Sequence, residues 1–261
     1  MATQRVRRNR TMIIALILVA VLVIWMFVSC SSGGGQGSPT PASTFANGPF
    51  PAAAATPPRA SGVSDADVRT TSIAELADAT WVKDTAKKTG IPRRALAAYA
   101  GMAVRLAYTQ PDCGLTWNTL AGIGWVESHH GTIFGGKIAS DGTASEPIFG
   151  VSLDGSGDTI AMDDFDDGNF DGDPNGDRAV GPMQIIPMMW AAWHSDGNMD
   201  GVEDGQNIDD SVFAAAGYIC YSANTVKDRE GWNKGIYAYN QFGDYPQMVA
   251  EKADEYARTA G

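Results

Sequence analysis

The amino-acid sequence has few of the signals that indicate β-strands, and no segment of it repeats. These two absences exclude repeat architectures and favour a mainly α fold. Acidic residues are absent from the first sixty positions, so all 30 Asp and Glu lie further along the chain. Of the 19 basic residues, four are N-terminal arginines and 15 lie further along the chain. The chain beyond the N-terminal arginines therefore has a net charge of about −15. This charge argues against a nucleic-acid partner, although a solvated acidic surface accounts for most of it.

One uninterrupted apolar run, Met12–Val28, precedes the acidic part of the chain. Its 17 residues are about the minimum for a helix that spans a membrane and exceed most signal-peptide cores. Nothing amphipathic interrupts the run, which disfavours a buried core helix. Because the arginines at positions 5, 7, 8 and 10 lie ahead of it, the positive-inside rule places the remaining chain outside the membrane.

Cys30 follows this run directly, in the sequence Phe27-Val28-Ser29-Cys30. The tetrapeptide resembles a bacterial lipoprotein processing site, except that Phe27 stands where leucine is usual. Lipidation of Cys30 and an uncleaved helix are both open, and either tethers the chain to the outer face of the membrane. We therefore expect an anchor over residues 1–30, a disordered Gly-, Ser-, Pro- and Ala-rich linker over 31–62, and one folded domain over 63–261.

The folded domain contains two further cysteines, Cys113 and Cys220. An even pair in an oxidising compartment predicts a disulfide, with two separate buried thiols as the alternative. The cross-link would close a loop of roughly a hundred residues, which the chain-entropy model rewards with about 4 to 5 kcal/mol at most.

Capping residues, prolines and apolar spacing predict short helices joined by long polar loops. Ser72 and Glu75 form a capping box for a helix towards Lys88. The other expected helices run from Pro92 to Tyr108, from Thr116 to Gly131, from Pro187, from Asp209 and from near Pro246. Between Gly131 and Gly181 lies an aperiodic stretch rich in Gly and Asp, and a loop of that length is usually functional or disordered.

Glu127 lies near the C-terminal end of the helix that is expected to begin at Thr116. The negative end of the helix dipole and the apolar neighbours both disfavour its carboxylate, so this side chain could keep a proton near neutral pH. A solvated surface glutamate is the alternative. His129 and His130 follow, but adjacent helical side chains point about 100° apart, so they are expected at the rim or surface rather than as metal ligands.

Residues 196–207 have the pattern of a calcium-binding loop. Oxygen ligands are expected from Asp196, Asn198, Asp200, the backbone of Val202, and Asp204, with glycine at the sixth position. The twelfth position is Asn207 instead of a bidentate glutamate, which leaves an Asx-rich turn as the alternative. A second acidic cluster, Asp171, Asp173, Asn175 and Asp177, is interpreted as loop.

Three segments stand in order along the chain: Gly-Trp-Val-Glu127-Ser128-His-His-Gly131, Ala179-Val-Gly-Pro-Met183-Gln184 with Pro187 and Trp190, and Ala238-Tyr239-Asn240. Together they resemble the motifs of lytic transglycosylases, most closely the B-type membrane-bound lytic murein transglycosylases in their actinobacterial form. Thr89-Gly-Ile-Pro92, Ala97 and Tyr99 extend the resemblance upstream, so that it covers roughly residues 70 to 258.

The resemblance implies a lysozyme-like helical fold and cleavage of the β-1,4 bond between N-acetylmuramic acid and N-acetylglucosamine in peptidoglycan. Glu127 would act first as general acid and then as general base while a 1,6-anhydro ring closes, and no cofactor is required for this chemistry. Ser128, Met183, Gln184, Tyr239 and Asn240 would line the groove. Some members of the family bind calcium in an EF-hand-like loop, which adds to the case for a structural calcium in residues 196–207.

Two alternatives share the same residues. The first is a muramidase that hydrolyses the same bond on the same fold. The second is a non-catalytic module that binds peptidoglycan without cutting it. A third hypothesis, a calcium-dependent adhesion domain, is supported only by the loop at 196–207. In each case the partners are the wall glycan and, through the N-terminus, the membrane at the outer face of a bacterial cell.

Overall fold

The computed structural model describes residues 45–156, 159 and 161–261. The expected anchor, Cys30 and the linker up to position 44 lie outside these residues. Within the described part of the chain, no helix is long and apolar enough to cross a membrane.

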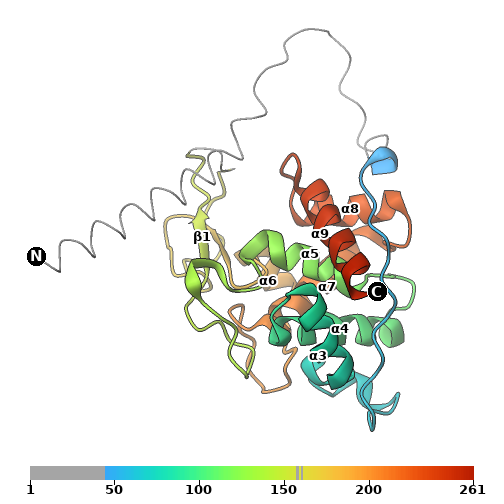
Figure 1. Cartoon of the computed structure of the whole chain (residues 1–261). Coiled ribbons are helices and arrows are strands. Elements are labelled where there is room, and N and C mark those ends of the chain that lie inside the picture. The colour runs from blue at the N-terminus through green and yellow to red at the C-terminus, as the bar shows by residue number, and fades with distance from the viewer. Residues whose placement is uncertain (1–44, 157–158, 160) are drawn as a thin grey trace, which may run out of the picture. The chain divides into compact units, whose positions relative to one another are not determined.

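The described chain is mainly helical, as the sequence predicts. Two short 3-10 turns, η1 and η2, precede α3, and a third, η3, follows α5. The elements are η1 (Asp67–Arg69), η2 (Ile73–Glu75), α3 (Ala79–Thr89), α4 (Arg93–Thr109), α5 (Trp117–Ser128), η3 (Ile133–Gly135), α6 (Pro187–Trp193), α7 (Ile208–Ala223), α8 (Arg229–Tyr239) and α9 (Tyr245–Ala260). Figure 1 shows α5 in the middle of the domain, with the other long helices around it.

Helix α5 packs against α9 and α4, and its backbone approaches both closely. A Cβ atom at Gly122 would lie 2.7 Å from the carbonyl oxygen of Val249 in α9. A Cβ atom at Gly124 would overlap the hydroxyl group of Tyr99 in α4. Glycine is therefore needed at both positions, because any larger residue would push α5 away from its two neighbours.

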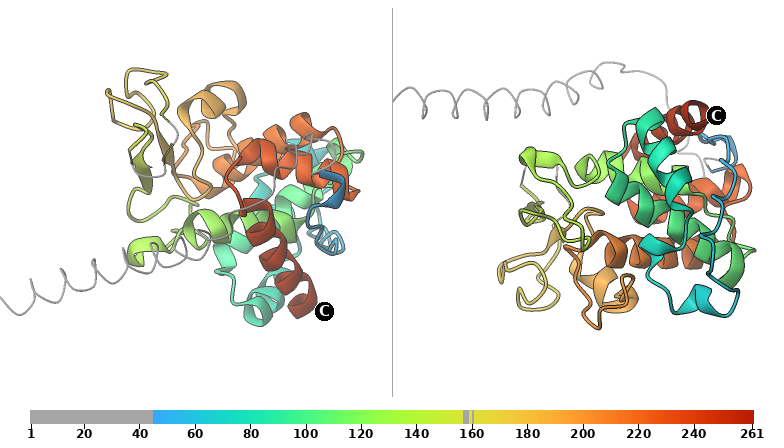
Figure 2. Two further views of the ribbon diagram at one scale, coloured as in Figure 1. Left: turned by 90° about the horizontal axis from the view of Figure 1, so that it is seen from above. Right: turned by 60° about the horizontal axis from the view of Figure 1, so that its bottom comes forward.

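The long stretch between Gly131 and Gly181 contains the only regular strands among the described residues, β1 (Phe149–Ser152) and β2 (Arg178–Val180). They pair antiparallel with an irregular register between Phe149 and Ser152. Figure 2 shows this two-stranded sheet and its loops gathered at one end of the domain, beside α5 and α6. The described residues of this stretch thus form an ordered subregion.

Two helix starts differ from the sequence expectation. Ser72 begins only the short turn η2, and Asp78 caps α3 instead, its carboxylate accepting from the backbone N–H of Trp81 at 2.8 Å. Asn207 caps α7 in place of Asp209, which lies in the first turn. Asp209 is fully buried and paired with Arg94, so its carboxylate serves a tertiary ion pair.

Residues 45–62, expected as the end of a flexible linker, are hydrogen-bonded along the helices instead. Asn118 in α5 accepts from the N–H of Ala54 at 3.2 Å and donates to the carbonyl of Ala52 at 2.9 Å. Further along, the N–H of Asp78 donates to the carbonyl of Pro58 at 2.8 Å. The segment follows the helices in Figure 1, so the folded domain begins well before residue 63.

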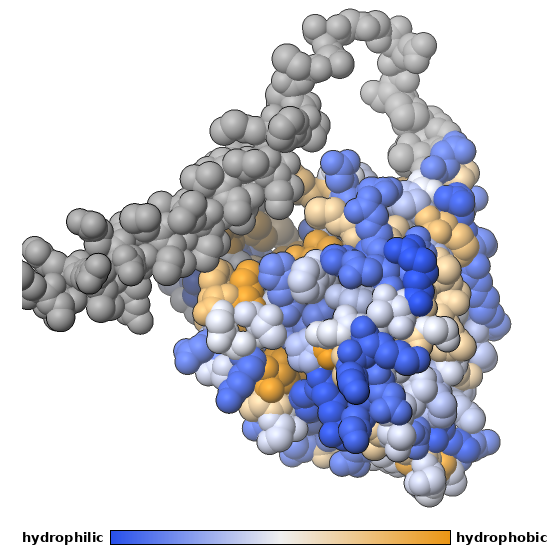
Figure 3. Space-filling model, in the orientation of Figure 1, coloured by the Kyte–Doolittle hydropathy of each residue, from blue (hydrophilic) through white to orange (hydrophobic). Residues whose placement is uncertain are grey.

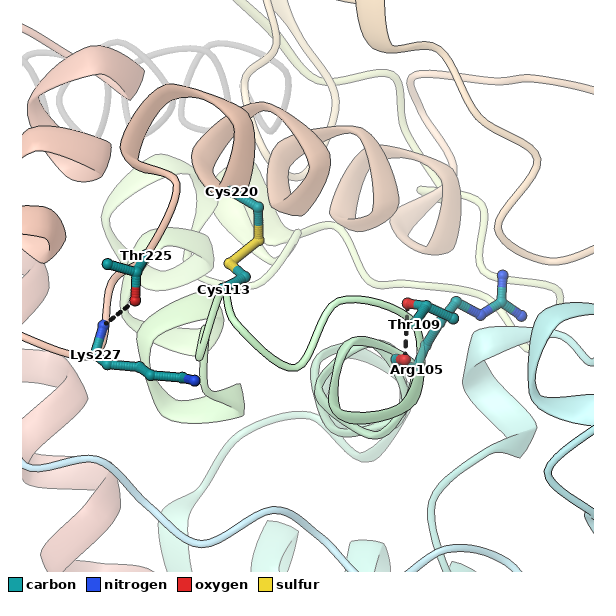
Figure 4. Close-up of a disulfide and its surroundings, with 6 residues drawn as sticks. All are labelled: Arg105, Thr109, Cys113, Cys220, Thr225 and Lys227. Atoms are coloured by element: carbon teal, nitrogen blue, oxygen red, sulfur yellow. Dashed lines mark hydrogen bonds between the residues drawn. A yellow bond between two sulfur atoms is a disulfide. The ribbon is translucent and has the colours of Figure 1, made fainter.

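The disulfide between Cys113 and Cys220 is present, as predicted from the sequence. It joins the loop after α4 to the last turns of α7 (Figure 4), across a sequence separation of 107 residues. The carbonyl of Cys113 also accepts from the N–H of Val226 at 2.7 Å. This hydrogen bond holds the connection between α7 and α8 next to the disulfide.

Figure 3 shows hydrophilic residues over much of the face turned to the viewer, with apolar residues in a few patches between them.

Replacing both Cys113 and Cys220 with alanine should lower the free energy of unfolding by up to about 5 kcal/mol, because the long loop is no longer closed in the unfolded chain. Denaturant titration followed by circular dichroism measures the change. The wild-type chain in reductant is the matched control and should behave like the double variant. Identical unfolding midpoints for oxidised and reduced wild type would contradict this role of the disulfide.

Candidate active site

Glu127 is the second-last residue of α5. The chain reverses after Ser128, the last residue of this helix. His129, His130 and Gly131 all have left-handed backbones, with φ of 50°, 62° and 79°. The N–H groups of His129 and His130 bond to the carbonyls of Trp125 and Gly124, so they close the end of the helix. Left-handed conformations are costly for residues with a side chain and persist only where surrounding contacts enforce them.

His130 is held by two tyrosines from the helices that flank α5. The Tyr99 hydroxyl lies 3.1 Å from His130 Nδ1, and the Tyr256 hydroxyl lies 2.9 Å from Nε2. The imidazole is buried, which lowers its pKa to about 3 and keeps it neutral. The expectation of a rim or surface position is therefore wrong for His130 and correct for His129, which is exposed against the ring of Trp125. One ring nitrogen of His130 donates and the other accepts, so this residue ties α5 to α4 and α9.

The Glu127 carboxyl is partly exposed and accepts a hydrogen bond from the Tyr245 hydroxyl at 2.5 Å. Burial raises the pKa of Glu127 to about 7, and the hydrogen bond from Tyr245 opposes part of that rise. The direction agrees with the expectation from the sequence, with desolvation as the principal cause. Glu127 is therefore divided between its protonated and ionised forms near neutral pH, as an acid that gives and regains a proton must be.

Tyr239, at the last position of α8, adds a second phenol to this site. Its hydroxyl donates to the carbonyl of Met183 at 2.7 Å. Burial raises its pKa well above the ordinary value, and the nearby charge of Glu127 adds to the rise. Tyr239 therefore lies close to Glu127 while it fixes the backbone of the 182–184 segment, and it stays protonated.

Ser128 and Met183 are the buried residues where the end of α5 meets the 182–184 segment. Ser128 Oγ donates to the carbonyl of Pro182 at 2.6 Å and accepts from the N–H of Gly131 at 2.8 Å. Ser128 is 1% exposed and Met183 is fully buried. In this arrangement neither side chain offers surface to a ligand, so both position the site rather than line it.

Gln184 and Asn240 are partly exposed, and each is turned to its own loop. The Gln184 side chain donates to the carbonyl of Gly181 at 3.0 Å, and its backbone has a positive φ of 49°. The Asn240 side chain accepts from the N–H of Phe242 at 2.9 Å. The structure thus bonds the 182–184 backbone to Tyr239 and to Ser128, the residue after Glu127. The side chains of Gln184 and Asn240 bond to their own loops.

Tyr245 is the site residue that the sequence interpretation missed. It lies in the first turn of α9, one residue before the proline that predicts the start of that helix. Its 118-residue separation from Glu127 means that no local pattern could reveal the contact. The only signal in the sequence was a tyrosine directly before the proline near the start of the C-terminal helix.

The loop at 196–207 has part of the geometry of a calcium site. The N–H of Asp200 bonds to Oδ1 of both Asp196 and Asn198, and the N–H of Gly201 bonds to Asp196 Oδ2 at 2.9 Å. The side chains at the first and third positions therefore hold the loop's own backbone at the fifth and sixth. The twelfth position does not fit, since Asn207 is buried and uses its side chain to cap α7 and to bond Asp141.

Asp210 is fully buried in α7 and accepts hydrogen bonds from the backbone of this loop. Its Oδ1 accepts from the N–H groups of Gly197 and Asn198, and its Oδ2 accepts from that of Asp204 at 2.9 Å. Burial nevertheless raises the pKa of Asp210 to about 7. Asp204 uses its own side chain to bond the N–H of Gln206, and Val202 is exposed.

A cavity of about 620 Å³ lies beside the same loop, away from Glu127. It is lined in part by Glu75, Arg93, Arg94, Asp141 and Asp200. Arg94 is paired with Asp209, so the other charged residues of the lining are one basic residue, Arg93, and three acidic ones, Glu75, Asp141 and Asp200.

Comparison of the chain with models of protein families, with curated proteins and with solved structures found no match. The functional assignment therefore depends on the site residues and their geometry.

Replacing Tyr245 with phenylalanine should raise the pKa of Glu127 by about 1, because the lost bond favours the ionised carboxyl and a bond to a charged group contributes about 1.5 kcal/mol. Carbon-13 NMR titration of the glutamate side chains measures it, with Glu127→Gln used for assignment. Tyr237→Phe, at an exposed tyrosine of α8, is the control and should leave the pKa unchanged. An unchanged or lower pKa in Tyr245→Phe would show that the phenol does not stabilise the carboxylate.

Proposed function

We propose that this protein is a lytic transglycosylase that cleaves the β-1,4 bond between N-acetylmuramic acid and N-acetylglucosamine in peptidoglycan. The observation that carries the proposal is the carboxyl of Glu127, which lies at the end of α5, accepts a hydrogen bond from the Tyr245 hydroxyl and has a pKa of about 7. The ordered motifs around Glu127, Gln184 and Tyr239 support it. The proposal includes a lysozyme-like arrangement of the helices around α5.

In the proposed reaction, the protonated Glu127 donates its proton to the glycosidic oxygen as the bond from that oxygen to the muramoyl C1 breaks. The carboxylate that remains accepts the proton of the C6 hydroxyl of the same sugar. The C6 oxygen then bonds to C1 and closes a 1,6-anhydro ring. The proton of Glu127 is restored, no water is consumed, and the glycan supplies its own nucleophile.

The tyrosines tune this acid. Tyr245 donates to Glu127 and stabilises the carboxylate that exists between the two proton transfers. Tyr239 donates to the Met183 carbonyl, which fixes the 182–184 backbone. Gln184 and Asn240, which are partly exposed near this site, are the proposed contacts to the sugar.

A hydrolytic muramidase is the nearest alternative and needs a second carboxylate to activate water or to act as nucleophile. The Glu127 carboxyl accepts a hydrogen bond from the phenol of Tyr245, and its charge raises the pKa of a second phenol, Tyr239. This composition favours the anhydro route. A module that only binds peptidoglycan would not require a carboxyl group whose pKa is about 7, so it is the weaker alternative.

The proposed location is the outer face of a bacterial plasma membrane, with the chain tethered through its N-terminal segment. The support is the apolar run Met12–Val28 behind four arginines and the disulfide between Cys113 and Cys220, since disulfides persist in oxidising compartments. Calcium takes no part in the proposed chemistry. A cation at residues 196–204 would be structural.

Digestion of purified sacculi, with mass spectrometry of the released products, tests the proposal. The wild-type chain should release muropeptides with anhydro ends, and Glu127→Gln should reduce the rate by about 100-fold or more, since general acid–base catalysis contributes at least that much. Glu230→Gln is the matched control, because Glu230 is exposed at the opposite end of α8 from Tyr239. Products heavier by one water, with reducing ends, would identify a muramidase, and binding without products would identify a non-catalytic module.

The rate should also depend on pH in a defined direction. Glu127 must hold a proton to begin the reaction, so kcat/KM should fall as the pH rises through about 7. In Tyr245→Phe the same decline should occur at higher pH, because removal of the hydroxyl raises the pKa. Initial rates on a soluble glycan fragment across the pH range measure both profiles. A rate that continues to rise above pH 8 would exclude Glu127 as the proton donor.

A further inference from the structure

The loop at 163–177 concentrates negative charge more strongly than any other segment of the domain. It contains seven aspartates in fifteen residues and no lysine or arginine. Like charges at this density repel one another, so a folded loop needs hydrogen bonds, protons or a cation to offset the repulsion.

Hydrogen bonds bring three parts of this loop together around Asp177. Asp177 Oδ1 accepts from the N–H of Phe165 at 2.9 Å, directly after Asp164. Asp171 Oδ2 accepts from the N–H of Arg178 at 2.7 Å, directly after Asp177. The carboxyl groups of residues 164, 171 and 177 are thereby held in one neighbourhood by backbone contacts.

The second oxygen of Asp177 is the unexplained feature. Asp177 is 1% exposed, and its Oδ2 is buried without a hydrogen-bond partner. A buried carboxylate oxygen that lacks a partner is costly, and a native fold seldom leaves one without a ligand. Burial raises the pKa of Asp177, and the carboxylates of Asp171, Asp164 and Asp166 raise it further.

We propose that Asp177 Oδ2, together with Asp164, Asp166 and Asp171, binds a calcium ion. Every donor in the cluster is an oxygen atom, and the loop has neither cysteine nor histidine, which favours a hard cation over zinc or copper. Calcium accepts an irregular shell of carboxylates and backbone oxygens, whereas magnesium demands a near-octahedral one.

Binding involves a small closure of the loop. As they stand, the described residues include no group of three or more His, Cys, Asp or Glu side chains close enough to hold a metal. The cation draws Asp164 and Asp171 towards Asp177 Oδ2 against their mutual repulsion. The bonds of Asp164 and Asp166 to the N–H groups of Gly168 and Phe170 keep the backbone between them compact during this closure.

The closure bears on the candidate active site because the loop leads straight into it. Arg178 lies over the ring of Phe149, so the end of the loop begins the pairing of β2 with β1. Phe170 stacks on Trp190 of α6 with centroids 5.0 Å apart. The cation would therefore fix both sides of the segment that carries Met183 and Gln184, whatever reaction the site performs.

Calorimetric titration of the full-length chain in detergent with calcium chloride, after removal of divalent ions with EDTA, tests the site. The loop at 196–207 is a second acidic loop, so the titration is repeated in an Asp196→Asn/Asp200→Asn background. The proposal expects calcium binding to persist in that background and to weaken at least tenfold when Asp177→Asn or Asp164→Asn is added. Asp163→Asn, an exposed neighbour, is the matched control and should bind as the background does.

Melting temperatures separate a metal ligand from a merely structural residue. In EDTA, Asp177→Asn should melt above the wild type, because it removes a buried, repelled charge without changing shape. In calcium, the wild type should gain several degrees and Asp177→Asn should not. The proposal is overturned by binding that disappears in the Asp196→Asn/Asp200→Asn background, by absence of calcium binding to the wild type, or by an Asp177→Asn chain that melts lower in both buffers.

Discussion

The position of the last turn of α5 depends on a single buried imidazole. His130 can bond the hydroxyls of Tyr99 and Tyr256 only if the chain reverses in a left-handed conformation directly after Ser128. Because Gly124 has no side chain, the Tyr99 hydroxyl can lie against α5 and reach His130. The neutral His130 then connects three helices. Glu127, three residues earlier, is thereby held at a fixed place between the core and the solvent.

The chemistry of Glu127 follows from what surrounds it. A carboxyl at a buried helix end would lose too much hydration to ionise near neutral pH, whereas a fully exposed one would ionise well below it. Tyr245 offsets part of the lost hydration through one hydrogen bond and so keeps the pKa of Glu127 near 7. Tyr245 belongs to α9, which also carries Tyr256. The packing of α9 on α5 therefore fixes both the place of the acid and its proton affinity.

Local patterns in the sequence predicted what local forces decide. The mainly helical class, the start of α6 at Pro187 and the rise in the pKa of Glu127 all follow from neighbouring residues. The Cys113–Cys220 bond followed from cysteine count and compartment. The misassigned cap at Asp209 and the burial of His130 have another cause, because Arg94 and the two tyrosines reach them from distant elements. Tertiary partners overrode propensity at these positions, and no spacing rule encodes such partners.

Two buried aspartates show how the domain carries its excess of negative charge. Asp210 fills both oxygens with three backbone N–H groups from the loop at 196–207, so that loop wraps a carboxylate that already has its partners. Asp177 receives one N–H group and keeps one buried oxygen unbonded among three further carboxylates. Backbone donors have satisfied the first carboxylate, whereas the second is surrounded by charge of its own sign. A cation satisfies the remaining oxygen and also neutralises the neighbours of Asp177, which a single proton does not.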